Sequence, residues 1–209
     1  MSRLLSVAAL TLITAIPLGA QAPKGWLLRA DRSVSAADPD APGVIKFSAQ
    51  GAGFHAIAPQ AAVFWNPANT ATGNYTLKGT FTLVRPSDHT NFYGLVFGGS
   101  NLEGPRQTYL YFMVAQDGTW LIKQRTGDVR TNEISAKTRH PAVKTPDATG
   151  MSTNALEVRV MPNKIDYAVN GTVVHSTPRT GATATTDGLY GIRVNHRLEV
   201  RVADFALSK

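Results

Sequence analysis

The chain has 209 residues, a formal net charge of +7 and no cysteine. The absence of cysteine excludes disulfide scaffolds and thiolate metal sites, so the fold must be stable through its hydrophobic core. The basic residues form no long run and no nucleic-acid-binding motif, so we interpret the charge as a solvated surface and expect no nucleic-acid partner. Attraction to anionic glycans or cell-wall polymers is the alternative interpretation.

The first 22 residues have the pattern of a secretory signal peptide. A short positive start, Met1-Ser2-Arg3, precedes an apolar stretch over residues 4–18 and the cleavage pattern Ala20-Gln21-Ala22. The apolar stretch is short for a membrane span and is interrupted by Pro17. We therefore expect a secreted or periplasmic protein without membrane insertion, with one domain over residues 23–209.

The first half of the mature chain reads as short strands separated by turns. Residues 66–74 are rich in Asn, Thr, Pro and Gly and predict a loop. Residues 92–97 and 109–115 are apolar on both faces, which is typical of central strands covered on both sides. In chain order, the strands of this half are expected at residues 26–28, 44–49, 54–58, 62–65, 75–84, 92–97 and 109–115.

The second half alternates apolar and polar residues even more clearly. Asp117-Gly118 and Asn170-Gly171 each separate two strand-like segments and predict tight hairpins. The polar segment 129–137 is expected to be an edge strand. The remaining strands are expected at residues 119–125, 156–160, 165–169, 172–175, 190–194 and 198–202. With no long amphipathic helix, the sequence predicts an all-β, two-sheet antiparallel sandwich.

Five segments also appear in an order known from one superfamily: Tyr93–Gly99, Tyr109–Phe112, Asp117–Trp120, Ile165–Gly171 and Asp187–Ile192. Together they resemble the concanavalin A-like lectin/glucanase superfamily. The nearer similarity is to laminin-G-like domains and to bacterial secreted domains grouped with 3-keto-disaccharide hydrolases. The resemblance implies a jelly-roll sandwich in which one sheet is concave and commonly binds glycan.

The signatures of catalysis and metal binding in that superfamily are missing. None of the four glutamates is followed two residues later by aspartate, so the Glu-x-Asp-x-x-Glu strand of the glucanases is absent. Calcium-binding lectins of the superfamily need clustered Asp and Asn, and the one comparable cluster is Asp38 with Asp40. The five histidines have no metal-binding spacing. We expect no metal and no cofactor; calcium is possible but unsupported by a motif.

Aromatic and basic side chains give the best candidates for a binding site. Tyr109 and Tyr111 share one face of their strand, while Leu110, Phe112 and Val114 supply the core on the other. An aromatic platform with polar groups around it is the usual way in which a β-sandwich binds a sugar ring. The candidates on the concave sheet are Tyr93, Tyr109, Tyr111, Lys123, Arg125, Arg193, Asn195 and His196. Alternatively, the tyrosines pack beneath a covering loop, either 85–91 or 138–153.

Three functions remain open from the sequence. The first is a secreted, lectin-like protein that binds carbohydrate or another extracellular ligand without catalysis. The second is a glycoside hydrolase or a 3-keto-disaccharide hydrolase-like enzyme on the same fold, for which Asp166, His196 and Glu199 are the acids or bases to test. The third is a structural or adhesion module. For His196 and for the two carboxylates, turn chemistry and cross-strand ion pairing are the simpler interpretations.

Overall fold

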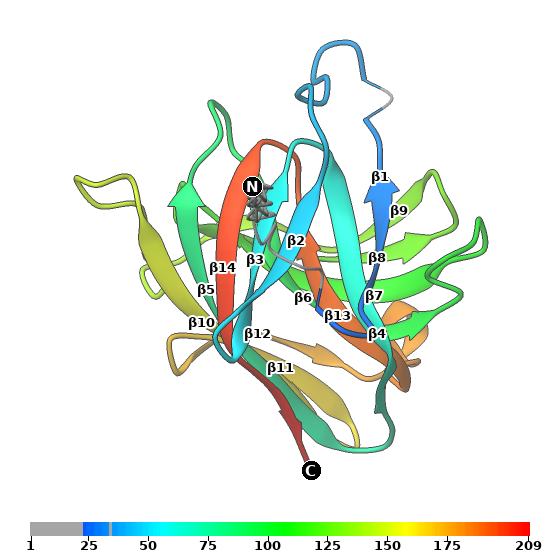
Figure 1. Ribbon diagram of the computed structural model, residues 1–209. Helices are drawn as coiled ribbons and strands as arrows, with labels where there is room; N and C mark the ends of the chain where they lie inside the picture. The colour runs from blue at the N-terminus through cyan, green and yellow to red at the C-terminus, as the bar shows by residue number, and fades with distance from the viewer. Residues whose placement is uncertain (1–22, 34) are drawn as a thin grey trace, which may run out of the picture.

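The computed structural model describes residues 23–33 and 35–209, so the expected signal peptide lies outside the described residues. In this part of the chain, 14 strands and one short 3-10 helix form two stacked antiparallel sheets (Figure 1). The two-sheet sandwich expected from the sequence is therefore confirmed. No helix among the described residues is long and apolar enough to cross a membrane.

Sheet A contains seven strands in the order β1-β4-β13-β6-β7-β8-β9. Its edge strands are β1 and β9, which agrees with the edge position expected for the polar segment 129–137. Its strands are β1 (Leu27–Asp31), β4 (Ala61–Ala71), β6 (Phe92–Ser100), β7 (Thr108–Ala115), β8 (Thr119–Thr126), β9 (Arg130–Arg139) and β13 (Gly188–Val194).

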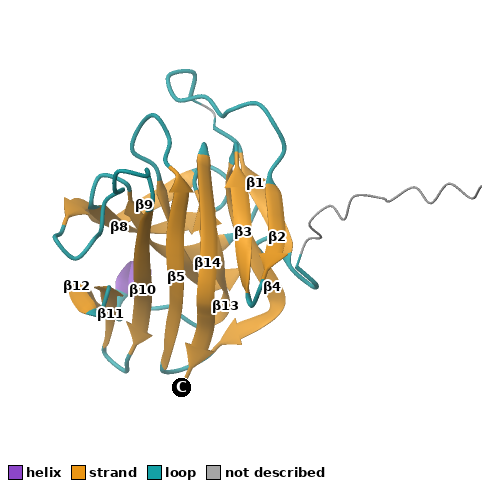
Figure 2. Cartoon of the chain, turned by 60° about the vertical axis from the view of Figure 1, so that its left-hand side comes forward, coloured by secondary structure: helices purple, strands orange, loops and turns teal. Residues whose placement is uncertain are grey.

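Sheet B also contains seven strands, in the order β12-β11-β10-β5-β14-β3-β2, and several of them cross the front of Figure 2. The 3-10 helix η1 (Gly181–Thr183) lies between β12 and β13. The strands are β2 (Lys46–Gln50), β3 (Gly53–Ala58), β5 (Tyr75–Arg85), β10 (Ser152–Val160), β11 (Lys164–Val169), β12 (Thr172–Pro178) and β14 (Leu198–Ser208).

Both predicted hairpins are present. Asn170 and Gly171 have φ angles of 51° and 82°, and they join β11 to β12 as a turn with two left-handed residues. At the β7–β8 connection only Gly118 has a positive φ, 80°, so this turn is built differently from the first. In both cases glycine supplies a backbone conformation that other residues adopt only with strain.

The loop expected over residues 66–74 is much shorter than predicted, because β4 continues to Ala71. The prediction followed from the Asn, Thr, Pro and Gly content of the segment, and its Pro67 cannot donate a backbone hydrogen bond within a sheet. In β13 the register jumps from Leu189, opposite Thr70, to Gly191, opposite Trp65. Residues 66–69 therefore form a bulge without ladder partners in β13, and a proline is tolerated there.

The main core lies between the sheets and is built from the inward-facing residues of both. Leu110, Phe112 and Val114 of β7 belong to it, as the alternation predicted. Tyr93 also belongs to it: its side chain is completely buried and its ring lies 6.0 Å from that of Phe81. The expectation that Tyr93 lies on an open sheet face with the other candidates was therefore wrong. Residues 92–99 are buried on both faces, so their sequence does not show which face is which.

Candidate functional site

The outer face of sheet A is strongly hollowed. Arg125 of β8 and Asp31 of β1 approach within 3.8 Å, although five strand spacings separate their strands in the sheet. In a flat sheet this separation would be ~24 Å, at about 4.8 Å per strand. The sheet must therefore curl, so that side chains from distant strands meet above its middle. We call this concave region, between β1 and β8, the hollow.

Arg193 of β13 organises the polar side chains inside the hollow. Its Nη1 donates hydrogen bonds to Asp31 Oδ2 and, over 2.7 Å, to the hydroxyl of Tyr109. Its Nε donates to Asn195 Oδ1 over 3.2 Å. The guanidinium also lies over the ring of Tyr111, 5.6 Å from the centroid. The hollow thus contains a buried arginine that two tyrosines, an aspartate and an amide surround.

The electrostatics of this network favour a charged pair. Burial alone would raise the pKa of Asp31. The charge and the hydrogen bond of Arg193, with the charges of Arg125 and Arg29, together outweigh burial and hold this pKa below its usual range. Burial would lower the pKa of Arg193, but Tyr109 and Asp31 hold it above the usual value. For Tyr109, burial raises the pKa. Asp31 is therefore ionised and Tyr109 neutral at ordinary pH.

The tyrosines do not form an open platform. Tyr109 is 1% exposed and Tyr111 is 6% exposed, and both belong to a second apolar cluster on the outer face of sheet A. Leu102, from the loop between β6 and β7, joins the same cluster. Burial of the tyrosines was one of the two alternatives that the sequence left open. The cover is the arginine network with this loop, and not the segments 85–91 or 138–153.

The two other basic candidates lie at the β8 side of the hollow. Arg125 donates from Nε to the carbonyl of Gly127 over 2.9 Å, so the turn after its own strand holds it in place. Lys123 is more exposed and lies 3.7 Å from Glu133 on the neighbouring strand β9. The structure therefore brings together five of the predicted residues in the hollow, namely Tyr109, Tyr111, Lys123, Arg125 and Arg193. Their role in binding stays a prediction.

The hollow opens into a pocket at the end of the sandwich where the β1–β2, β5–β6 and β13–β14 loops meet, the upper end in Figures 1 and 2. The pocket has a volume of about 150 Å³, and the predicted residues Asn195 and His196 lie in its wall. Its lining residues are Asp31, Ser33, Asp38, Ala61, Asn91, Arg193, Asn195 and His196. Apart from Ala61, every one carries a polar side chain.

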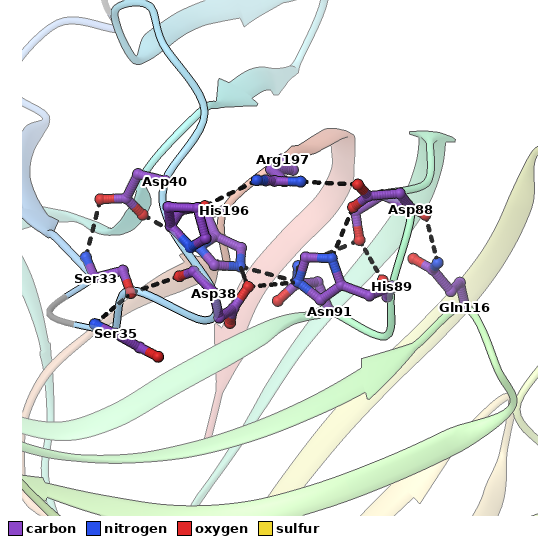
Figure 3. Close-up of polar contacts among 12 residues, drawn as sticks. Ser33, Ser35, Asp38, Asp40, Asp88, His89, Asn91, Gln116, His196 and Arg197 are labelled. Atoms are coloured by element: carbon purple, nitrogen blue, oxygen red, sulfur yellow. Dashed lines mark hydrogen bonds and ion pairs between the residues drawn. The ribbon is translucent and has the colours of Figure 1, made fainter.

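A histidine pair lies beside this pocket (Figure 3). The Nε2 atoms of His89 and His196 are 3.2 Å apart, and Asp38 Oδ1 lies 3.0 Å from the first and 3.2 Å from the second. These side chains come from the β5–β6, β13–β14 and β1–β2 loops, respectively. His196 is buried, whereas His89 and Asp38 are partly exposed. Among the described residues, this is a group whose ligand atoms are close enough to share one metal ion.

A larger groove, of about 600 Å³, lies at the same end of the molecule. Residues 41–44 form one wall and residues 85–88 form part of another. Its lining is mostly small apolar residues and prolines, with Lys46, Arg85 and Arg197 as basic members. None of the residues that the sequence singled out for ligand binding lines it.

The two carboxylates of the enzyme hypothesis lie far apart. Asp166 of β11 and Thr76 of β5 both pair with the same residue of β10, Arg159. Glu199 of β14 instead pairs with Arg85 of β5. Thr76 and Arg85 are nine positions apart along β5, which corresponds to ~30 Å. A retaining or inverting glycosidase needs its carboxyl groups within about 10 Å. Asp166 instead accepts hydrogen bonds from Lys164 and Ser176, so the two residues do not form an acid/base pair.

Sequence reasoning missed most of the pocket. Asp31, Ser33 and Asn91 lie in or next to segments without regular alternation, and Asp38 and Asp40 were noted only as a weak calcium-like cluster. His89 and His196 are separated by 107 positions, so no local spacing reveals them. The one usable signal was the placement of both histidines in loops that adjoin sheet strands, which does not by itself show that the loops meet.

No protein-family model and no curated protein sequence matches this chain. Solved structures share its fold. The carbohydrate-binding module CBM66 from Bacillus subtilis aligns with a TM-score of 0.61 at 9% identity, covering 88% of this chain and 96% of that one. The carbohydrate recognition domain of Emp46p aligns with a TM-score of 0.58 at 11% identity, covering 88% of this chain and 87% of that one. Alginate lyase A1-II' aligns with a TM-score of 0.51 at 12% identity, covering 88% of this chain and 94% of that one. These similarities support a concanavalin A-like jelly-roll fold.

Proposed function

We propose that this protein is a secreted, lectin-like module that binds carbohydrate without catalysis, and that it holds the end of a glycan in the pocket beside the hollow. The observation that carries the proposal is the lining of this pocket. Seven of its eight lining residues are polar or charged and they come from β1, β13 and three loops. Sugar hydroxyls both donate and accept hydrogen bonds, so a wall with both kinds of group suits them.

Several of these groups have hydrogen-bonding capacity left over. Nη2 of Arg193 and Nδ2 of Asn195 donate to no described residue, although both side chains line the pocket. Their partners in the hollow fix them in place, because Arg193 is held by Asp31 and Asn195 accepts from Arg193. Groups fixed in advance lose less conformational entropy when a ligand binds. This favours a binding role for Arg193 and Asn195.

The size of the pocket favours a glycan end over a long chain. Its volume of about 150 Å³ is below the ~300–1,000 Å³ of pockets that enclose a drug-sized ligand. One sugar unit is the part of a glycan that fits such a space, and the rest of the chain would extend over the loops. Two of the three similar structures are described by their names as carbohydrate-binding, which supports the same ligand class.

Binding is favoured over hydrolysis because of the separation of Asp166 from Glu199. The two acids that line the pocket, Asp31 and Asp38, already have partners: Asp31 pairs with Arg193 and Asp38 contacts both histidines. The export of the protein, in turn, follows from the signal-peptide pattern in residues 1–22.

The test is a glycan array probed with the purified protein, followed by calorimetry with the best ligand. We expect Asn195→Ala to weaken binding by about 2- to 12-fold, the equivalent of one hydrogen bond of ~0.5–1.5 kcal/mol. Asn163→Ala is the matched control, because Asn163 lies in the exposed β10–β11 turn and should leave binding unchanged. An array without any ligand would refute the proposal and leave the structural or adhesion role. Turnover of a disaccharide or of its 3-keto form would favour the enzyme.

A further inference from the structure

The hydrogen bonds of His89 and His196 fix how the two rings present their nitrogens. Nδ1 of His196 lies 3.1 Å from Asp40 Oδ1, and Nδ1 of His89 lies 2.7 Å from Asp88 Oδ1. A carboxylate only accepts hydrogen bonds, so each Nδ1 donates to its own carboxylate. Nε2 is then the nitrogen that each ring can offer to a metal ion, and the two Nε2 atoms point toward the same place (Figure 3).

Two imidazole nitrogens that converge in this way are placed to share one metal ion. Asp38 Oδ1 adds a third ligand atom, at 3.0 and 3.2 Å from the two nitrogens. The amide Nδ2 of Asn91 lies 2.9 Å from His89 Nε2 and is the one neutral donor at this point among the described residues. Rotation of the same amide would turn Oδ1 of Asn91 toward them as a fourth ligand.

We propose that Asp38, His89 and His196 bind one zinc ion. The three ligand atoms form a nearly equilateral triangle with edges of 3.0–3.2 Å. Around a tetrahedral zinc with bonds of 2.0–2.1 Å, the edge between two ligands is about 3.3 Å. Two imidazole nitrogens and one carboxylate oxygen are zinc ligands of the usual kind, whereas calcium prefers six to eight oxygens.

The charge and the outer partners of the cluster also fit a divalent cation. Metal ligation requires both rings to be neutral. Asp38, Asp40 and Asp88 then supply three formal negative charges, and Arg197, which donates to Asp88 over 2.8 Å, supplies one positive charge. The net charge of these groups is therefore −2, which one Zn²⁺ ion would neutralise. Carboxylates that accept the second N–H of a ligating histidine are the usual outer partners of such sites, and they orient the rings.

The zinc site goes beyond the proposed function and does not rest on it. Three side chains complete a triangle and leave the fourth tetrahedral position for Asn91, water or a ligand atom. Asp38, Asn91 and His196 also line the small pocket, so the ion would lie at the wall of the space proposed for the glycan end. Zinc would also join three loops that are otherwise distant in sequence, and it should therefore stabilise the fold.

The test is to treat the purified protein with a chelator, dialyse it against zinc chloride, and measure bound metal by mass spectrometry and affinity by calorimetry. We expect one zinc per chain and a higher melting temperature with zinc. His89→Ala should abolish stoichiometric binding, and because His89 is partly exposed this variant should fold. Asp40→Ala, which removes only an outer partner, should weaken zinc binding by about 10- to 100-fold.

His55→Ala is the matched control: His55 is partly buried and paired with a carboxylate, Glu199, but it lies in sheet B away from the cluster. This variant should bind zinc with the same stoichiometry and affinity as the unchanged protein. Zinc-free protein after dialysis, or full binding by His89→Ala, would show that the cluster is only an ion-paired link between loops. Zinc binding with a blank glycan array would refute the proposed function alone, and glycan binding without zinc would refute the metal site alone.

Discussion

The hydroxyl of Tyr109 lies 3.3 Å from the carboxylate of Asp31, although four strand spacings separate β7 from β1 in sheet A. A flat sheet would hold these strands ~19 Å apart. The contact exists because the sheet is curled and because Arg193 stands between the two residues and bonds to both. The centre of the hollow is therefore occupied by the protein's own side chains, and the space for a ligand lies at the loop end.

Removal of Asp31 should be strongly destabilising. Asp31→Ala leaves the buried guanidinium of Arg193 without its counter-charge, and loss of one partner of a buried ion pair costs about 3–5 kcal/mol. The measurement is the free energy of unfolding in urea. Glu133→Ala is the control, since the pair of Glu133 with Lys123 is exposed and should contribute no more than ~1 kcal/mol. Equal effects of the two changes would contradict a buried network.

The same ion pair predicts a pH dependence. Against the opposing effect of burial, Arg193 holds the pKa of Asp31 below its usual range in the folded state. The unfolded chain then binds the proton more readily, so this stabilisation is complete above about pH 4 and is lost as the pH falls through the folded pKa. The difference in unfolding free energy between the protein and Asp31→Asn should therefore shrink below about pH 4. A difference that stays constant from pH 7 to acid would contradict the prediction.

The strands could be predicted from the sequence because the alternation of apolar and polar residues is a local signal. In β10, for example, Leu156, Val158 and Val160 are buried while Ala155 is exposed, and the pattern is visible residue by residue. Local signals predict the wrong structure where tertiary pairing overrides them. The Asn66-Pro67 segment looked like a loop but belongs to β4, because a bulge opposite β13 removes the need for a proline N–H.

The site was less predictable than the strands. Alternation placed Tyr109 and Tyr111 on one face correctly, but not their burial, which depends on the curl of sheet A and on Arg193 above them. Tyr93 was assigned to the wrong face because every residue of its strand segment is apolar. The histidine pair depends on two loops meeting in space, and a single sequence carries no signal for such a contact.

The burial of Tyr111 has a consequence for mutagenesis of the hollow. Tyr111→Ala removes a ring that is 6% exposed, and truncation of a buried aromatic side chain costs about 3–5 kcal/mol. This variant should lower the unfolding free energy by that amount, so any loss of glycan binding would be indirect. Tyr111→Phe keeps the ring and should cost less than ~1.5 kcal/mol. If Tyr111→Ala melts like the unchanged protein, the ring is not part of a packed cluster.

Gly191 should be the least tolerant of the glycines that support the hollow. It lies at the bulge of β13 opposite Trp65, and a Cβ there would come within 2.2 Å of the Phe64 carbonyl oxygen in β4. Because the obstacle is backbone, Gly191→Ala must push β4 and β13 apart, which should cost at least about 1–3 kcal/mol. The shift would also displace Arg193, two residues further along β13, and so open the network in the hollow.

Gly104→Ala is the appropriate comparison, since the nearest atom to its added Cβ is 3.9 Å away and its φ is not in the left-handed region. That change should stay within ~0.5 kcal/mol in urea unfolding. Trp65, beside the bulge, is one of the three tryptophans of the chain. The native-state tryptophan fluorescence should therefore change in Gly191→Ala and not in Gly104→Ala. A Gly191→Ala protein as stable as Gly104→Ala, with native fluorescence, would mean that β4 and β13 are not held as closely as their register requires.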